Sequence, residues 1–204
     1  MSGGMRAPVA VETGALIVAI LALVLMIAGC DVVVTTAQLP AVREDAILGQ
    51  WKDLGTPGSP PESSPLLVRF TGGVYRIGSP EDFAKGKDTS FTLARAGRAL
   101  IAEVQTDACD EFGENGQPCW SLSLVDIRGA RMNWYDFDAQ RLGRASFTGT
   151  LNVAHSLHRR RNSDGSFDNS VLLSADAAAL QSFLAGYVKQ RGALRLSGRL
   201  VRTQ

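Results

Sequence analysis

Residues 120–137 read WSLSLVDIRGARMNWYDF, and this stretch decides the fold class. Apolar and polar side chains alternate in its first half, which is the two-residue period of a β-strand. The chain reverses at Arg128-Gly129, where glycine accepts turn conformations, and a second alternating stretch follows. The pattern predicts two antiparallel strands. On the second strand one face carries Met132, Trp134 and Asp136, and the other carries Asn133, Tyr135 and Phe137.

The same pattern continues on both sides of this pair. Short apolar runs flank turn residues at 71–73, 95–98 and 162–165, and each predicts a further hairpin. One clear helix follows, because Ser174 can cap its start, Gly192 can end it and apolar side chains form a stripe between them. We therefore predict a mainly β fold. Its antiparallel meander forms a barrel or a strongly curved sheet, with one C-terminal amphipathic helix followed by a last strand.

The order of these elements resembles that of the lipocalin-like barrels. Gly49-Gln50-Trp51 matches the Gly-x-Trp element that this family carries on its first strand. The resemblance implies that Trp51 packs at the closed end of a barrel, beneath an arginine near the last strands. Three arginines are candidates for that role: Arg195, Arg199 and Arg202.

The N-terminal residues indicate where the chain is located. Ile27-Ala28-Gly29-Cys30 follows the apolar run from Ala15 to Met26 and resembles the lipobox of bacterial lipoprotein precursors. The resemblance implies a signal peptide over residues 1–29, a lipidated tether over 30–45 that begins at Cys30, and a β domain over 46–204. The chain as a whole resembles small bacterial envelope lipoproteins of unassigned function.

Two other interpretations of the N-terminal segment remain open. The apolar run is about long enough to serve as an uncleaved transmembrane anchor, and it also fits a plain secretory signal. All three interpretations put the rest of the chain outside the cytoplasm. By resemblance to lipoproteins of enteric Gram-negative bacteria, Asp31 implies retention on the periplasmic side of the inner membrane rather than the outer membrane. We therefore expect a protein of the bacterial cell envelope, held to its membrane by an N-terminal lipid.

Two cysteines remain besides Cys30. An exported chain meets an oxidising compartment, where Cys109 and Cys119 can close a loop that is rich in turn-forming residues. We predict a structural disulfide between them. A redox pair and a metal site are the alternatives, but redox cysteines are usually separated by two residues. The acidic residues of this loop also do not follow the ligand order of a calcium loop.

The residue pattern does not predict an enzyme. It contains no recognisable nucleophile elbow, phosphate-binding glycine loop or carboxylate pair. His155 and His158 would lie on opposite faces of a strand, so they do not predict a metal site, and we expect no cofactor. The formal charges nearly cancel, and no nucleic-acid partner is expected. Arg159-Arg160-Arg161 either ends a solvated hairpin or contacts a phosphate or lipid headgroup.

Two functions remain, and the role of four aromatic residues distinguishes between them. Trp120, Trp134, Tyr135 and Phe137 either line a cavity for a lipid or other apolar ligand, or fill a core. In the first case the chain is a membrane-anchored binding module. In the second case it is a non-catalytic accessory or structural subunit that docks on an inner-membrane or envelope protein complex. A cavity of roughly a few hundred Å³ would favour the first.

Overall fold

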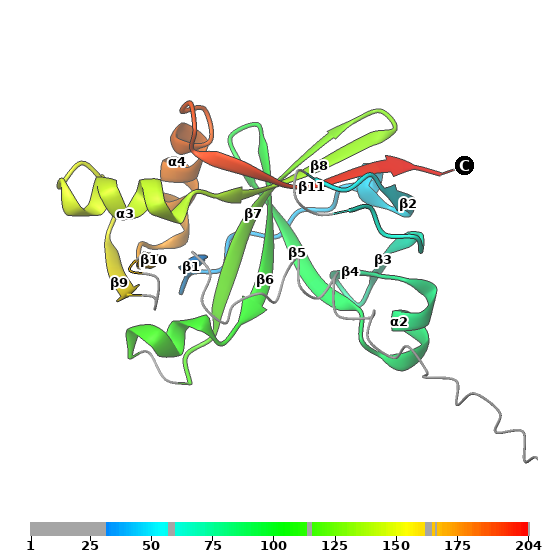
Figure 1. Ribbon diagram of the computed structural model, residues 1–204, viewed down its shortest axis with the longest axis horizontal. Coiled ribbons are helices and arrows are strands. Elements are labelled where there is room, and N and C mark those ends of the chain that lie inside the picture. The colour runs from blue at the N-terminus through cyan, green and yellow to red at the C-terminus, as the bar shows by residue number, and fades with distance from the viewer. Residues whose placement is uncertain (1–31, 57–59, 114–115, 162–164, 166, 204) are drawn as a thin grey trace, which may run out of the picture.

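The computed structural model of the chain describes residues 32–56, 60–113, 116–161, 165 and 167–203. It is mainly β, as predicted, and eight of its strands close into an antiparallel barrel through the pairing of β6 with β7 (Figure 1). In the order in which they pair, the barrel strands are β2 (Gly49–Asp53), β3 (Leu66–Thr71), β4 (Val74–Gly78), β5 (Thr89–Ala96), β6 (Ala99–Thr106), β7 (Cys119–Arg128), β8 (Arg131–Phe137) and β11 (Leu194–Arg202).

Three more strands extend the sheet beyond the barrel. They are β1 (Val32–Thr35), β9 (His155–Arg161) and β10 (Phe167–Leu173). The long strand β7 connects the two parts, because it pairs with β6, β8 and β1. β1 pairs with β10 in parallel, so the antiparallel meander that we predicted is not the whole sheet.

The start of the β domain also differs from the prediction. Residues 32–35 were expected to belong to a tether, but they form β1, with Val33 and Val34 buried. Consecutive β-branched side chains favour an extended conformation that is packed on both faces. Leu39 is buried as well, and the structured domain therefore begins before residue 46.

The hairpin turns follow the sequence closely. Gly72 and Gly73 connect β3 to β4 with φ angles of 62° and 87°, a region that other residues rarely adopt. Gly97 has a φ of 62° between β5 and β6. The predicted hairpins at 71–73 and 95–98 are therefore confirmed.

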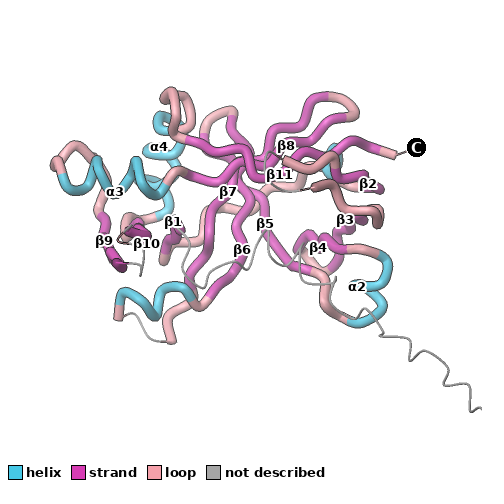
Figure 2. Tube along the Cα trace, viewed as in Figure 1, coloured by secondary structure: helices cyan, strands magenta, loops and turns pink. Residues whose placement is uncertain are grey.

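The described residues form three α-helices where one was predicted. These are α2 (Pro80–Lys85), α3 (Ala139–Phe147) and α4 (Ala177–Tyr187), and two short 3-10 helices, η1 (Asp45–Ile47) and η2 (Ala108–Phe112), accompany them. α4 begins after Asp176 rather than Ser174, because the Asp176 carboxylate accepts a hydrogen bond from the Ala179 N–H at 2.8 Å. It ends at Tyr187, before the predicted Gly192. Figure 2 shows α3 and α4 on the side of β1, β9 and β10, away from α2.

Two apolar cores lie on the two faces of the barrel wall. The inner core takes side chains from all eight barrel strands, whereas the outer core joins strands β5 to β8 to β1, β10, α3 and α4. Leu100 and Ile101 on β6 illustrate the division, because the first belongs to the inner core and the second to the outer core. The outer core fixes the positions of α3 and α4.

Aromatic side chains pack across the barrel interior. The ring of Phe91 on β5 lies 5.3 Å from that of Tyr75 and 5.5 Å from that of Trp134 on β8. Because β6 and β7 separate β5 from β8 in the barrel wall, the contact between Phe91 and Trp134 crosses the interior. Side chains of this size are sufficient to fill an eight-stranded barrel.

Trp51 closes one part of the inner core. It is fully buried, and its Nε1 donates to the Ile47 carbonyl at 2.9 Å. Of the three candidate arginines, Arg202 is the one that covers it, with its guanidinium carbon 4.5 Å from the ring centroid. Arg202 also donates to the Leu48 carbonyl at 2.7 Å, and so holds the chain before β2 against β11.

Candidate functional site

The four aromatic residues predicted from the sequence do not line one common cavity. Trp134 points into the barrel, whereas Tyr135 and Phe137 occupy the other face of β8. Trp120 lies near the start of β7, paired with Thr35 on β1 and Gln105 on β6. The prediction of a shared site therefore does not match the positions of these residues, because the two-residue period of β8 divides its aromatics between two cores.

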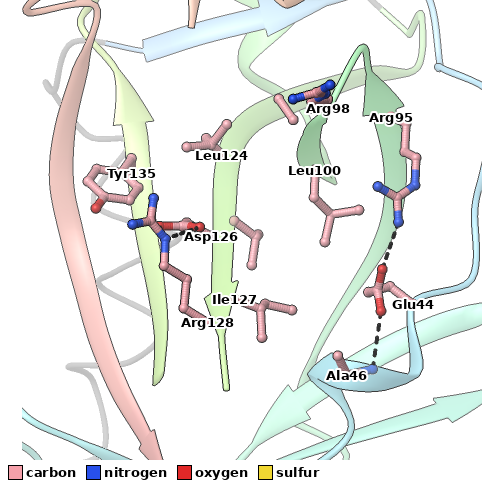
Figure 3. Close-up of a pocket in the computed structure, with 12 residues that line it drawn as sticks. Glu44, Ala46, Arg95, Arg98, Leu100, Leu124, Asp126, Ile127, Arg128 and Tyr135 are labelled. Carbon is pink, nitrogen blue, oxygen red and sulfur yellow. Dashed lines mark hydrogen bonds and ion pairs between the residues drawn. The ribbon is translucent and has the colours of Figure 1, made fainter. Parts of the chain in front are cut away.

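Charged residues dominate one hollow of about 420 Å³, beside the turns of two hairpins (Figure 3). Arg95 pairs with Glu44 at 2.8 Å, and Arg128 pairs with Asp126 at 3.0 Å. Tyr135 belongs to the lining. Carboxylates already pair with two of the three arginines in its lining, and Arg98 is the third.

A larger hollow of about 680 Å³ lies between α3 and α4, and we call it the helix groove. Leu151, Phe183 and Tyr187 are the large apolar residues of its lining, and Gly186 on α4 leaves room beside them. Exposed polar groups such as Ser182 form its rim. The full lining is Arg141, Ala145, Thr150, Leu151, Asn152, Ala179, Ser182, Phe183, Gly186, Tyr187 and Gln190.

Local sequence features place the two helices that form the groove. Asp138 caps α3 by accepting from the Arg141 N–H at 2.8 Å. Gly143 lets α3 approach β10 closely, since a Cβ at this position would lie 3.2 Å from Cγ of Asn169. On α4, Leu180 and Leu184 are fully buried in the outer core. Both helices are thus fixed to the sheet, and the groove between them is open to solvent.

The hydroxyl of Tyr187 is buried at the groove, and no described residue forms a hydrogen bond of normal geometry with it, although the Arg141 guanidinium lies close enough to act on its pKa. Its ring stacks on Phe183 at 5.3 Å and on Phe137 at 6.1 Å, and only 3% of the residue is exposed. Burial raises the pKa of Tyr187 to about 12, although the positive charge of Arg141 acts in the opposite direction. Tyr187 is therefore a neutral phenol that can donate a hydrogen bond at physiological pH.

Arg141 brings a positive charge to the same lining. Its Nη1 donates to the Arg191 carbonyl at 2.6 Å, and its Nη2 donates to Oε1 of Gln190 at 3.4 Å. Both acceptors are neutral, and no carboxylate of the described residues forms an ion pair with Arg141. A guanidinium has five N–H donors, so further donors remain for a ligand.

Sequence reasoning missed both Tyr187 as a polar group and Arg141 altogether. Tyr187 was interpreted only as part of the apolar stripe of a helix, where tyrosine is a common core residue. Arg141 lies in residues 138–142, whose sequence indicates only a short turn or helical piece. The two come together because α3 and α4, which are far apart in the sequence, pack side by side on one sheet (Figure 2). No local signal in the sequence predicts that pairing.

The outer core also contains a buried carboxylate that sequence reasoning missed. Glu103 on β6 is 1% exposed, and Oε1 accepts from the Leu39 N–H at 2.9 Å. Thr92 donates to Oε2 at 3.3 Å. Burial raises the pKa of Glu103 to about 7, against the effect of these two hydrogen bonds. Its partners are the chain before η1 and the adjacent strand, so its role in the fold is structural.

The cysteine prediction is confirmed. Cys109 in η2 and Cys119 at the start of β7 form a disulfide, with Cα atoms 6.1 Å apart, and both residues are fully buried. Their neighbours Val34 and Leu172 complete a small apolar cluster. The bond therefore joins η2 to the start of β7, and the cluster packs this end of the barrel against β1 and β10.

The histidines are engaged in ordinary packing and hydrogen bonds. The two ring nitrogens of His155 lie 2.7 Å from the Val153 carbonyl and 2.8 Å from Oγ of Ser146. The ring of His158 stands edge-on to Phe112 at 6.1 Å. In the part of the chain that the structure describes, no three His, Cys, Asp or Glu side chains are grouped to hold a metal ion.

Cys30 and the apolar run before it lie outside the described residues. Of the helices that are described, none combines the length and the apolar character that crossing a bilayer requires.

No protein-family model, curated protein or solved structure matches the chain. The chemistry of the site therefore rests on its own geometry.

Proposed function

We propose that the chain is a membrane-anchored extracytoplasmic lipoprotein whose β domain binds a lipid or other apolar ligand. The observation that carries this proposal is the helix groove, a hollow of about 680 Å³ whose lining includes the large apolar residues Leu151, Phe183 and Tyr187. This volume falls within the range of roughly 300 to 1,000 Å³ that is typical of small-molecule sites. The groove replaces the barrel interior as the site, because aromatic side chains fill the inner core.

The N-terminal part of the proposal rests on Cys30 and the apolar run before it. Val32, where β1 starts, stands only two residues after Cys30. β1 pairs in parallel with β10, and its first residue, Val32, lies opposite Ser170. β1 therefore begins towards the end of the sheet where β10 begins and β9 ends. At that end β9 carries Arg159, Arg160 and Arg161.

These arginines suit a surface that faces lipid. All three are exposed, although Arg160 lies 3.6 Å from Asp168 and Arg159 stacks on Phe167. Basic side chains close to an anchor are attracted by anionic headgroups. By the resemblance of Asp31 to a retention signal, the membrane is the inner membrane, with the β domain on its periplasmic side.

The groove can be tested with a neutral apolar fluorophore, N-phenyl-1-naphthylamine, and the purified full-length protein. Saturable enhancement of its fluorescence is expected. Gly186→Leu should weaken binding at least about tenfold, because a Cβ at this position meets no atom within 4 Å and the side chain can enter the groove. Ala178→Leu is the matched control, since Ala178 is exposed on α4 and lies outside the groove lining. Equal binding by both variants would rule out the groove as the site.

The anchor is tested by the intact mass of the protein taken from its native membrane. The mass expected is that of a chain that begins at an acylated Cys30. Recovery mainly of a chain that retains Met1 would contradict the lipoprotein assignment. Unsaturable fluorophore binding, together with a protein complex that co-purifies in fixed stoichiometry, would favour the accessory-subunit function instead.

A further inference from the structure

The helix groove contains two side chains with hydrogen-bond donors that are available to a ligand, Tyr187 and Arg141. The Tyr187 hydroxyl is buried without a hydrogen bond of normal geometry to any described residue, although buried polar groups are nearly always paired. The Arg141 guanidinium interacts with it, but a guanidinium can only donate, so the hydroxyl proton has no acceptor among the described residues. Arg141 lines the same groove and forms no ion pair with the described carboxylates. The apolar surface of Leu151 and Phe183 lies beside these donors. A ligand that suits the whole groove therefore combines an apolar part with a hydrogen-bond acceptor.

The charges around Tyr187 favour an acceptor that is anionic. Arg141 and Arg144 both act on its hydroxyl as positive charges, and Asp138 acts as a negative one. The Asp138 carboxylate is already engaged, because it caps α3 through the Arg141 N–H. The balance of charge around the Tyr187 hydroxyl is thus positive, which favours a bound anion.

We propose that the ligand is a long-chain carboxylate. Its carboxylate accepts a hydrogen bond from the Tyr187 hydroxyl and lies against the Arg141 guanidinium, and its hydrocarbon chain covers Leu151 and Phe183. A planar guanidinium matches the geometry of a carboxylate, and hydrogen bonds to a charged acceptor are stronger than those to a neutral one. This inference rests on the proposed function of the groove and adds the chemical class of its ligand.

The experiment compares three amphiphiles with the same chain: dodecanoate, 1-dodecanol and dodecyl phosphate. Each displaces N-phenyl-1-naphthylamine from the full-length protein, below the concentration at which it forms micelles. Dodecanoate should bind at least about tenfold more tightly than dodecanol, as one charged hydrogen bond predicts. Tyr187→Phe and Arg141→Gln should each weaken dodecanoate binding by about tenfold.

The two variants should affect dodecanol by no more than about threefold, since a neutral headgroup gains less from either donor. Retained binding of dodecanol and of the fluorophore also shows that the groove is intact in each variant. Tyr135→Phe is the matched control, because Tyr135 lies outside the groove, and it should leave all three affinities unchanged.

The possible failures are distinguishable. Equal affinities for dodecanoate and dodecanol, or a Tyr187→Phe variant that binds dodecanoate as the natural chain does, would overturn the carboxylate assignment and leave the apolar groove standing. A clear preference for dodecyl phosphate over dodecanoate would overturn it in favour of a phosphate headgroup. If neither the fluorophore nor any of the three amphiphiles binds saturably, the proposed function fails as well.

Discussion

Glu103 should make the stability of this protein depend on pH, and Glu103→Gln should remove that dependence. The carboxylate is buried between Leu39 and Thr92, and its pKa is raised from 4.5 to about 7. Glutamine has nearly the same shape. Its amide oxygen can accept from the Leu39 N–H, and its amide nitrogen can donate to the Thr92 hydroxyl.

The sign and size of the effect follow from the two pKa values. Between pH 4.5 and about pH 7, the folded protein keeps the Glu103 proton that the unfolded chain has already released. The stabilising contribution is therefore fully present below pH 4.5 and is lost as the pH rises towards 7. At about 1.4 kcal/mol for each pKa unit, the free energy of unfolding should fall by about 3 kcal/mol across this range.

Urea unfolding followed by tryptophan fluorescence measures this free energy at a series of pH values. Glu103→Gln should match the natural chain at about pH 5 and exceed its stability by about 3 kcal/mol at about pH 8. Glu81→Gln is the control, because Glu81 is exposed in a salt bridge with Lys85 that should contribute little. Asp136, whose pKa burial also raises, is present in every variant and cancels in the comparison. Parallel pH profiles for the Glu103→Gln variant and the natural chain would refute the reasoning.

Three further predictions concern stability. Replacing Cys109 and Cys119 by serine should lower the free energy of unfolding by about 2 to 3 kcal/mol, measured by urea unfolding, and an unchanged midpoint would contradict a structural disulfide. Arg202→Met should lower the free energy of unfolding by about 1 to 3 kcal/mol in the same assay, because it removes the cation from the Trp51 ring and leaves backbone carbonyls without their donor. An unchanged free energy would mean that water replaces the guanidinium. Tyr187→Phe should leave the free energy of unfolding unchanged or slightly raised, since its buried hydroxyl forms no hydrogen bond of normal geometry, and a loss of more than about 1 kcal/mol would indicate that the hydroxyl is bonded within the protein.

The sequence by itself was enough for the local features of this fold. The alternation over residues 120–137 predicted two strands, and β7 and β8 lie there. Glycines at 72, 73 and 97 predicted two of the hairpin turns, because few other residues adopt positive φ angles. Cys109 and Cys119 are the only cysteines of the chain besides Cys30, so each had the other as its expected partner. Each of these features depends on residues that are close together in the sequence.

The tertiary structure decided which surfaces are buried and where the candidate site lies. Alternation placed Trp134 and Phe137 on opposite faces of a strand, but it could not tell that both faces would be covered. Barrel closure through β6 and β7, together with the parallel pairing of β1 with β10, buries both faces and encloses Glu103.

The helix groove arises in the same way, because Arg141 on α3 and Tyr187 on α4 meet only when both helices pack on one sheet. The physical reason is that a local pattern records the conformation of a segment, whereas burial and pairing between distant segments depend on the free energy of the whole packed chain.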